Sequence, residues 1–326
     1  MFATRKLPLA ALALAMFVAV QLSAAPIPGV KAGGEDGDKW LLDDAEAIVI
    51  FNFKQFFESK LMKGGYTKQL QDFIQNNDQA KEMADKLGLD LTKDIDSLII
   101  SGSGTSREDA KARIVMKGNF NVEKLSKAMK EQDQVKVSKE GGVEIFELEA
   151  QGQSLYGAFA GKTAFVLTEN KETTATLAKG PTAVAKINKD VKAALNKFTG
   201  KESMAMIVVI NDQIKQLAAA NPQVANAVNS LTTVSASITV TEGITFQLVG
   251  NCSDAKGAAQ LEKQLTGLKA IAELGIGMAD NVPPIAKEAI EAIKIDKTRD
   301  SVVVSLTLTK EQIEKAAKMA GGGGGE

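Results

Sequence analysis

Alternating hydrophobic and polar residues mark a β-hairpin in the second half of the chain. Residues 234–240 alternate Val, Ala, Ile and Val with Ser and Thr, and residues 244–248 alternate Ile, Phe and Leu with Thr and Gln. Glu242-Gly243 lies between the runs, as in a two-residue hairpin turn. Alternation with period two places the apolar side chains on one face of each strand. The pattern therefore predicts an antiparallel hairpin with one buried face.

The same order of predicted elements occurs twice: strand, helix, hairpin, helix, hairpin. The two copies open with strands at 47–53 and 204–210, and the first hairpin of each ends in Gly-Asn, at Gly118-Asn119 and Gly250-Asn251. The first copy adds a further hairpin and a helical stretch. The remaining hairpins are predicted at 97–117, 135–148, 154–168 and 293–308, and the helical stretch at 171–197. Such self-similarity indicates an internal duplication.

The predicted fold class is α+β, a duplicated unit of antiparallel sheet with helices packed on it, because strands joined by tight hairpins pair antiparallel. The two units could share one continuous sheet or pack face to face. The expected organisation is a signal peptide (1–25), a flexible leader (26–39), a first α+β repeat with an extra hairpin and helical linker (40–200), a second α+β repeat (201–320) and a glycine-rich disordered tail (321–326).

The N-terminus has the three-part order of a secretory signal peptide. Arg5 and Lys6 precede an apolar run at 7–20, and Ser23-Ala24-Ala25 follows it. The run is shorter than the ~20 residues that a spanning helix needs. We therefore expect cleavage near Ala24 or Ala25, a secreted or periplasmic location, and no membrane span after signal removal. A retained membrane anchor is the alternative.

The charge balance and the lack of histidine argue against several classes of function. The 39 basic and 40 acidic residues nearly cancel, so no net field attracts nucleic acid. The chain has no histidine, which removes the commonest general base and zinc ligand. The acidic pair Asp94 and Asp96 lacks the spacing of a calcium-binding loop. We therefore expect no enzyme activity, no catalytic residue, no cofactor and no metal site.

Cys252 is the single cysteine, so the chain cannot form an internal disulfide. In the alignment of the two repeats it falls opposite Phe120. A position that accepts phenylalanine favours a buried apolar side chain, and lone cysteines are often buried. We interpret Cys252 as a small core residue. A reactive thiol is the alternative.

Two short motifs partly match known functional motifs. Gly161-Lys162-Thr163 resembles the end of a phosphate-binding loop, but Tyr156 stands where that motif needs glycine. We interpret it as a hairpin turn. Ser253 and Lys256 have the spacing of a serine–lysine pair, without the companion motifs of such enzymes. Ser253 or Asp254 is interpreted instead as the N-cap of a helix.

The loop from 102 to 109 is the main place where the first repeat departs from the tight turn of the second. Loops on a rigid scaffold commonly carry binding residues. A tolerated surface insertion is the alternative. The candidate interaction residues are Ser103, Thr105, Ser106, Arg107, Glu108 and Asp109.

Several short segments carry a family resemblance. They are Trp40-Leu41-Leu42-Asp43-Asp44 running into 47–52, Leu87-Gly88-Leu89-Asp90, Asp94-Ile95-Asp96-Ser97 and Gly141-Gly142-Val143. In these segments the chain resembles the uncharacterised secreted proteins of planctomycete bacteria, over most of its mature length. The resemblance implies export and a duplicated α+β body. It implies no activity and no site residue.

Three classes of function remain. We expect an exported, non-enzymatic envelope protein that binds a protein, peptide or other polymer through its sheet edges or loops. The first alternative is a carrier of an apolar small molecule or lipid, held in a pocket between sheet and helices. The second is a carboxylate-based hydrolase, for which the sequence offers no convincing pair of carboxylates. The expected partner is an envelope protein or polymer and not nucleic acid, and the oligomeric state is open.

Overall fold

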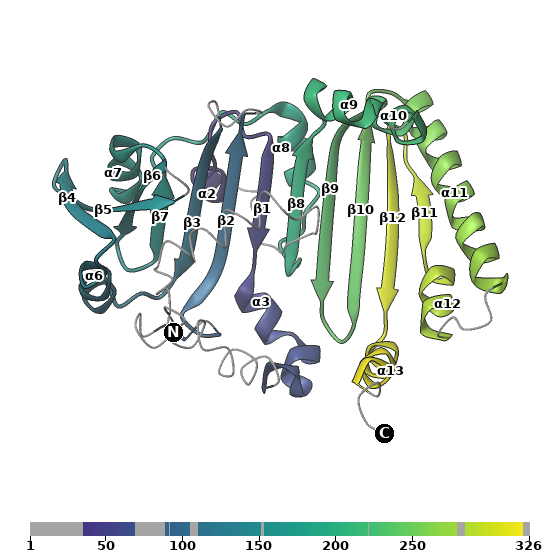
Figure 1. Cartoon of the computed structure of the whole chain (residues 1–326), viewed down its shortest axis with the longest axis horizontal. Helices are drawn as coiled ribbons and strands as arrows, with labels where there is room; N and C mark the ends of the chain where they lie inside the picture. The colour runs from purple at the N-terminus through teal and green to yellow at the C-terminus, as the bar shows by residue number, and fades with distance from the viewer. Residues whose placement is uncertain are drawn as a thin grey trace, which may run out of the picture.

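The structure is a computed structural model that describes residues 35–68, 89–90, 92–104, 110–150, 153–220, 222–278 and 284–321. The described strands form one antiparallel sheet of twelve strands, with helices on both faces and around its margins (Figure 1). The fold class is therefore α+β, as predicted. The two repeats share one continuous sheet, which decides between the two arrangements left open by the sequence.

The strands follow one another across the sheet in an order that differs from the sequence order. From one edge to the other they are β11 (Lys294–Lys297), β12 (Ser301–Leu308), β10 (Ile244–Cys252), β9 (Leu231–Val240), β8 (Met204–Val209), β1 (Ala47–Phe51), β2 (Ile95–Ser103), β3 (Lys111–Gly118), β7 (Ala164–Thr168), β6 (Gln153–Ala160), β5 (Val143–Ala150) and β4 (Val135–Glu140).

The helices lie between these strands in the sequence. They are α2 (Glu35–Asp38), α3 (Phe53–Glu58), the π-helix η1 (Met62–Tyr66), α6 (Val122–Lys130), α7 (Lys171–Ala178), α8 (Lys189–Leu195), α9 (Asp212–Ala219), α10 (Pro222–Asn229), α11 (Ala255–Met278), α12 (Pro284–Glu291) and α13 (Lys310–Gly321). Gln312 and Thr309 cap α13 reciprocally, since the backbone N–H of each donates to the side chain of the other.

The two repeats meet where their first strands, β1 and β8, pair antiparallel, with Val49 opposite Met206. On one side the order is β8, β9, β10, β12, β11, and on the other it is β1, β2, β3, β5, β4 once the hairpin β6–β7 is set aside. This arrangement has the topology of a twofold rotation about an axis between β1 and β8. The hairpin β6–β7 is the extra hairpin predicted for the first repeat, and it separates β3 from β5.

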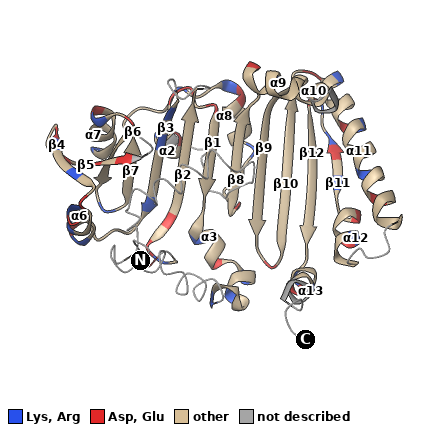
Figure 2. Cartoon of the chain, viewed as in Figure 1, with Lys and Arg blue, Asp and Glu red and all other residues tan. Residues whose placement is uncertain are grey.

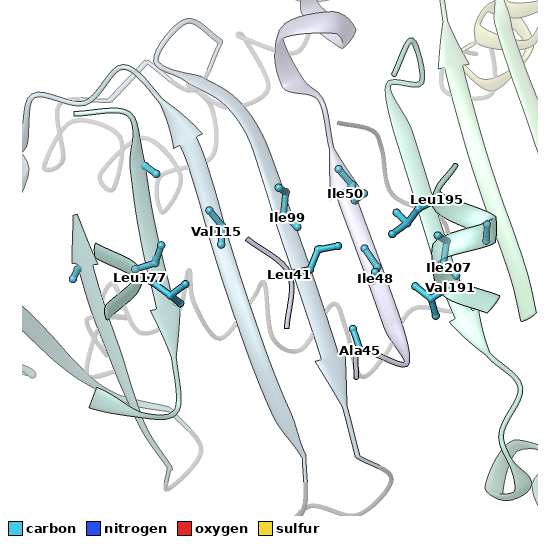
Figure 3. Close-up of a cluster of buried hydrophobic side chains, with 14 of the residues drawn as sticks. Leu41, Ala45, Ile48, Ile50, Ile99, Val115, Leu177, Val191, Leu195 and Ile207 are labelled. Carbon is cyan, nitrogen blue, oxygen red and sulfur yellow. The ribbon is translucent and has the colours of Figure 1, made fainter. Parts of the chain in front are cut away.

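One face of the sheet, here called the Ile48 face, is covered over the first repeat. Ile48, Ile99, Val115 and Ile207 point from neighbouring strands into a fully buried cluster beneath α7 and α8 (Figure 3). Beyond β8 the same face is mainly hydroxylic. Its residues there include Thr233, Ser235, Ser237, Thr239, Thr245, Ser301, Ser305 and Thr307. The large core therefore belongs mostly to the first repeat.

The opposite face, here called the Val49 face, is apolar across both repeats. Strand register places Val49 beside Ile100 and Met206. The Val49 face also includes Phe51, Leu98, Ile114, Val234, Ala236, Ile238, Phe246, Leu248, Val304 and Leu306. The five consecutive strands β1, β8, β9, β10 and β12 contain no Lys, Arg, Asp or Glu (Figure 2). Helices cover its margins, whereas Leu248 in the middle of β10 is 44% exposed.

Helix α11 carries Leu261, Leu265 and Leu268 at helical spacing, a pattern that favours one core-facing stripe. Leu261 is buried, but Leu268 is 62% exposed, and Ile271, Leu274 and Met278 are also exposed. On α9, Leu217 is exposed as well. Periodicity reports which residues share a helix face but not how far the partner surface extends. Here α11 runs on beyond the residues that contact the sheet.

The folded body begins earlier than the expected start near Trp40. Residues 35–38 of the predicted leader form α2, and Asp38 is completely buried in an ion pair with Lys192 of α8. The predicted helical stretch at 171–197 is two helices, α7 and α8. The predicted signal peptide, the leader up to residue 34 and the tail from 322 lie outside the described residues. No helix in the described part of the chain has the length and apolar character needed to span a membrane.

Candidate apolar binding cavity

A cavity of about 340 Å³ opens on the Val49 face, between strands of the first repeat and α9. Its apolar lining comes from five strands and one helix. These residues are Ala47, Val49, Ile100, Ala112, Ile114, Leu155, Val208 and Ile214. Polar residues also line the cavity and form its rim, and they include Glu46, Ser103, Gln153, Glu169, Asn211 and Gln213. An apolar interior with a polar rim is the usual composition of a ligand site.

The depth of the cavity follows from a row of small residues across the sheet. Ala47 pairs with Gly102, and Gly102 pairs with Ala112. In the next row on the same face, Val49, Ile100 and Ile114 are large. Strand register aligns the three small positions, so together they leave a space that larger side chains would fill.

Helix α9 forms one wall of the cavity but is loosely packed. Its N-cap residue Asn211 accepts a hydrogen bond from the backbone N–H of Ile214 at 3.1 Å, which fixes where the helix begins. Ile214 lines the cavity. No residue of α9 is buried, and Leu217 is exposed. The helix therefore borders the cavity without filling it.

Two carboxylates lie at the rim. Glu46 accepts a hydrogen bond from the backbone N–H of Gly104 at 3.3 Å, and Glu169 accepts one from Ala112 at 3.3 Å. Lys111 also borders the opening, but the strand register that places Arg113 on the Ile48 face places the Lys111 side chain on that face too. The two carboxylates at the rim therefore disfavour an anionic group at the entrance.

Arg113 lies on the Ile48 face, opposite the cavity floor, and donates a hydrogen bond to the carbonyl of Leu41. Burial lowers the pKa of the Arg113 guanidinium from its ordinary value, and the nearby carboxylates of Asp43 and Glu169 oppose that shift. The guanidinium still remains charged at neutral pH. Arg113 therefore balances part of the Glu169 charge through the sheet.

The predicted interaction loop borders this cavity. Ser103 is on its rim, as are Gly104 and Ala110 at the two ends of the loop. The other candidates, Thr105, Ser106, Arg107, Glu108 and Asp109, lie outside the described residues. Sequence reasoning missed the floor of the cavity. Its one signal was the occurrence of Ala47 and Ala112 inside predicted strands, whereas Gly102 was assigned to the loop, and only the register shows that the three positions are adjacent.

The other sequence candidates have structural roles. Cys252 is buried beside Leu231 and Leu261, which confirms its interpretation as a core residue. Burial raises the pKa of its thiol, opposed by a hydrogen bond with Ser230. Gly161 adopts a positive φ of 61° in the turn between β6 and β7. Asp254 caps α11 by accepting a hydrogen bond from the backbone N–H of Gly257 at 2.7 Å.

The sheet edges are poorer candidates for partner binding. The outermost strands are β4 and β11, and both carry lysines: Lys136 and Lys139 on β4, and Lys294 and Lys297 on β11. Charged residues on edge strands oppose the addition of a further strand. Within the described residues, no three His, Cys, Asp or Glu side chains gather where they could hold a metal ion. The cavity is therefore the best candidate site.

Comparison with known proteins gives structural likenesses alone. No protein-family model and no curated protein matches the chain. Among solved structures, crystal form IV of the treponemal protein TP0453 matches with a TM-score of 0.48 and 10% identity, covering 91% of this chain and 98% of that one. Crystal form I of TP0453 matches with a TM-score of 0.46 and 11% identity, covering 92% and 98%. These likenesses assign no function.

Proposed function

We propose that this protein is an exported binding protein without catalytic activity, which takes an apolar group of its partner into the cavity on the Val49 face. The observation that carries the proposal is the row of small residues, Ala47, Gly102 and Ala112, beneath a polar rim. The N-terminal sequence supports export. The lack of histidine supports a role in binding over one in catalysis.

The size of the cavity limits what it contributes alone. Its volume of about 340 Å³ is at the lower end of ligand sites, which span roughly 300–1,000 Å³. Burying ~200 Å² of apolar surface there yields ~5 kcal/mol at about 25 cal/mol per Å². Micromolar affinity requires about 8 kcal/mol. A partner must therefore also contact the rim or the adjoining surface.

Titration with an apolar dye tests the proposal. The purified mature protein is titrated with Nile red, whose emission shifts to the blue in apolar surroundings. We expect saturable binding, weakened about tenfold or more by Ala112→Phe, because the new ring fills the cavity. Ala259→Phe, at an exposed position of α11, is the matched control and leaves this binding unchanged. Dye binding that is insensitive to Ala112→Phe, with the fold intact by circular dichroism, contradicts the proposal.

A carrier of an apolar small molecule or lipid is the second candidate. The apolar lining of the cavity favours it, since a small ligand could be enclosed there without any protein partner. Mass spectrometry of a solvent extract from natively purified protein tests it. A ligand present in the wild type and lost in Ala112→Phe supports a carrier. Equal recovery from both proteins contradicts it.

A further inference from the structure

The twofold topology relates the cavity to an equivalent surface on the second repeat. There a segment of the same chain covers that surface. The segment after α3 turns as η1 over the Val49 face at the end of the β9–β10 hairpin. Leu61 and Met62 are 4% and 6% exposed there. They pack against Ile238, Val240 and Ile244. Two consecutive apolar side chains thus fill this surface.

Polar contacts hold the same segment in place. The backbone N–H of Leu61 donates to the carbonyl of Thr241 at 2.7 Å. Lys60, the residue before Leu61, forms an ion pair with Glu242 in the hairpin turn. The binding element is therefore a lysine followed by two apolar residues in a helical turn.

At the cavity of the first repeat, a helix borders the equivalent strands but does not fill the space above them. Helix α9 follows β8 as α3 follows β1, and it borders the loop end of β2 and β3 as η1 borders that of β9 and β10. However, α9 buries none of its residues. Where Leu61 and Met62 fill the space in one repeat, the described residues of the other leave a cavity. Carboxylates of Glu46 and Glu169 stand at its rim, as Glu242 stands beside Lys60.

We propose that the cavity binds a helical turn of another polypeptide that carries a lysine followed by two bulky apolar residues. This inference rests on the proposed function and names its ligand class. The apolar pair occupies the space above Ala47, Gly102 and Ala112, and the lysine pairs with a rim carboxylate. Burial of the pair provides affinity, and the charge provides orientation and selectivity.

A peptide with the sequence of residues 53–68 of this chain is the probe, because it contains Lys60, Leu61 and Met62. Fluorescence anisotropy of the labelled peptide is measured against the intact mature protein. We expect saturable binding, and about tenfold weaker binding when the peptide carries Leu61→Ser and Met62→Ser. Lys60→Glu in the peptide is expected to weaken binding severalfold at low salt and less at high salt. Equal binding of all three peptides overturns the inference.

Variants of the protein locate the binding site. Ala112→Phe is expected to weaken peptide binding about tenfold. Ile214→Glu on the surface helix α9 gives a second test if the first variant does not fold. Ala259→Phe is the control. Peptide binding that none of the cavity variants alters overturns the inference.

Competition separates this inference from the proposed function. If Nile red binds in a manner that depends on Ala112 and the peptide does not displace it, the cavity binds apolar groups but not this class of peptide. If neither dye nor peptide binding depends on Ala112, both proposals fail. Displacement by the peptide but not by its doubly substituted form supports both.

Discussion

The side-chain amide of Gln55 donates a hydrogen bond to the backbone carbonyl of Val240 at 2.8 Å, and this bond joins α3 of the first repeat to β9 of the second. Ser203, which is almost fully buried, completes the contact. Its hydroxyl donates to the amide oxygen of Gln55 and accepts from the backbone N–H of Val240 at 3.0 Å. The Gln55 amide, the Ser203 hydroxyl and the Val240 backbone thus form hydrogen bonds with one another at the boundary between the repeats.

Ser203→Ala is expected to lower the free energy of unfolding by about 1–3 kcal/mol, because it leaves the Val240 N–H without its partner in a buried site. Urea denaturation measures the loss. The double variant with Gln55→Ala should lose less than the sum of the single variants, because the side chains share one network. Strict additivity would show that the two act independently.

Lys192→Met is expected to destabilise the protein, because it leaves the completely buried Asp38 without its cation. Breaking a buried pair costs about 3–5 kcal/mol, and we expect about 2 kcal/mol here because the lysine is 40% exposed and screened by solvent. Asp38→Asn should cost less, since the amide is neutral. Lys189→Met, at an exposed position of the same helix, is the control for urea denaturation. Equal effects at 192 and 189 would contradict the role of the pair.

Native Cys252 is expected to react slowly with a thiol reagent, and quickly once urea unfolds the chain. The side chain is buried and burial raises its pKa, so both access and thiolate content are low. Absorbance of the released chromophore from a disulfide reagent measures the rate. Equal rates in native buffer and in urea would restore the reactive-thiol interpretation.

The same pKa shift predicts a pH dependence of stability. Because the thiol pKa of Cys252 is raised in the folded state, the folded chain keeps its proton when the unfolded chain has lost it. This contribution is complete below the ordinary thiol pKa and declines as pH rises toward the folded value. The difference in unfolding free energy between the wild type and Cys252→Ala should therefore shrink as pH rises above about 8.5. A constant difference would contradict the shift.

Two leucines of α11 should respond differently to truncation. Leu261→Ala removes a buried side chain and is expected to cost about 2–5 kcal/mol. Leu268→Ala changes an exposed position and is expected to stay within about 0.5 kcal/mol. Thermal and urea denaturation at two protein concentrations measure both. A large, concentration-dependent loss at Leu268 would reveal that another copy of the chain covers this residue in solution.

Local patterns predicted the hairpins well, and geometry explains why. In β9 and β10 one face is apolar and the other hydroxylic, so alternation is visible in the sequence. In β1 both faces are apolar, because Ile48 and Val49 point to opposite sides of the sheet and each meets other apolar residues. The sequence of such a strand does not indicate which other strand it pairs with. Its pairing with β8, which makes the sheet continuous, could not be inferred from the sequence.

The candidate site was predictable only in part. The loop that departs from the tight turn of the other repeat does border the cavity, through Ser103. The floor depends on Ala47, Gly102 and Ala112 lying side by side, although the first two are 55 positions apart in sequence. Small residues inside strands have no local signature of a site. Burial of Asp38 escaped prediction for the same reason, since its partner Lys192 is distant in sequence.

The hairpin β6–β7 has a consequence for the valency of the molecule. It places Leu155 at the cavity of the first repeat, whereas β10 and β12 pair directly in the second repeat and leave no place for an equivalent side chain. A protein built from two like units would ordinarily offer two like sites. Here the insertion, together with the self-coverage by Leu61 and Met62, breaks the symmetry. In the described part of the chain, the first repeat therefore keeps its cavity, whereas Leu61 and Met62 fill the equivalent surface of the second. If the proposed partner binds in this cavity, we expect each chain to bind one copy of it at this face.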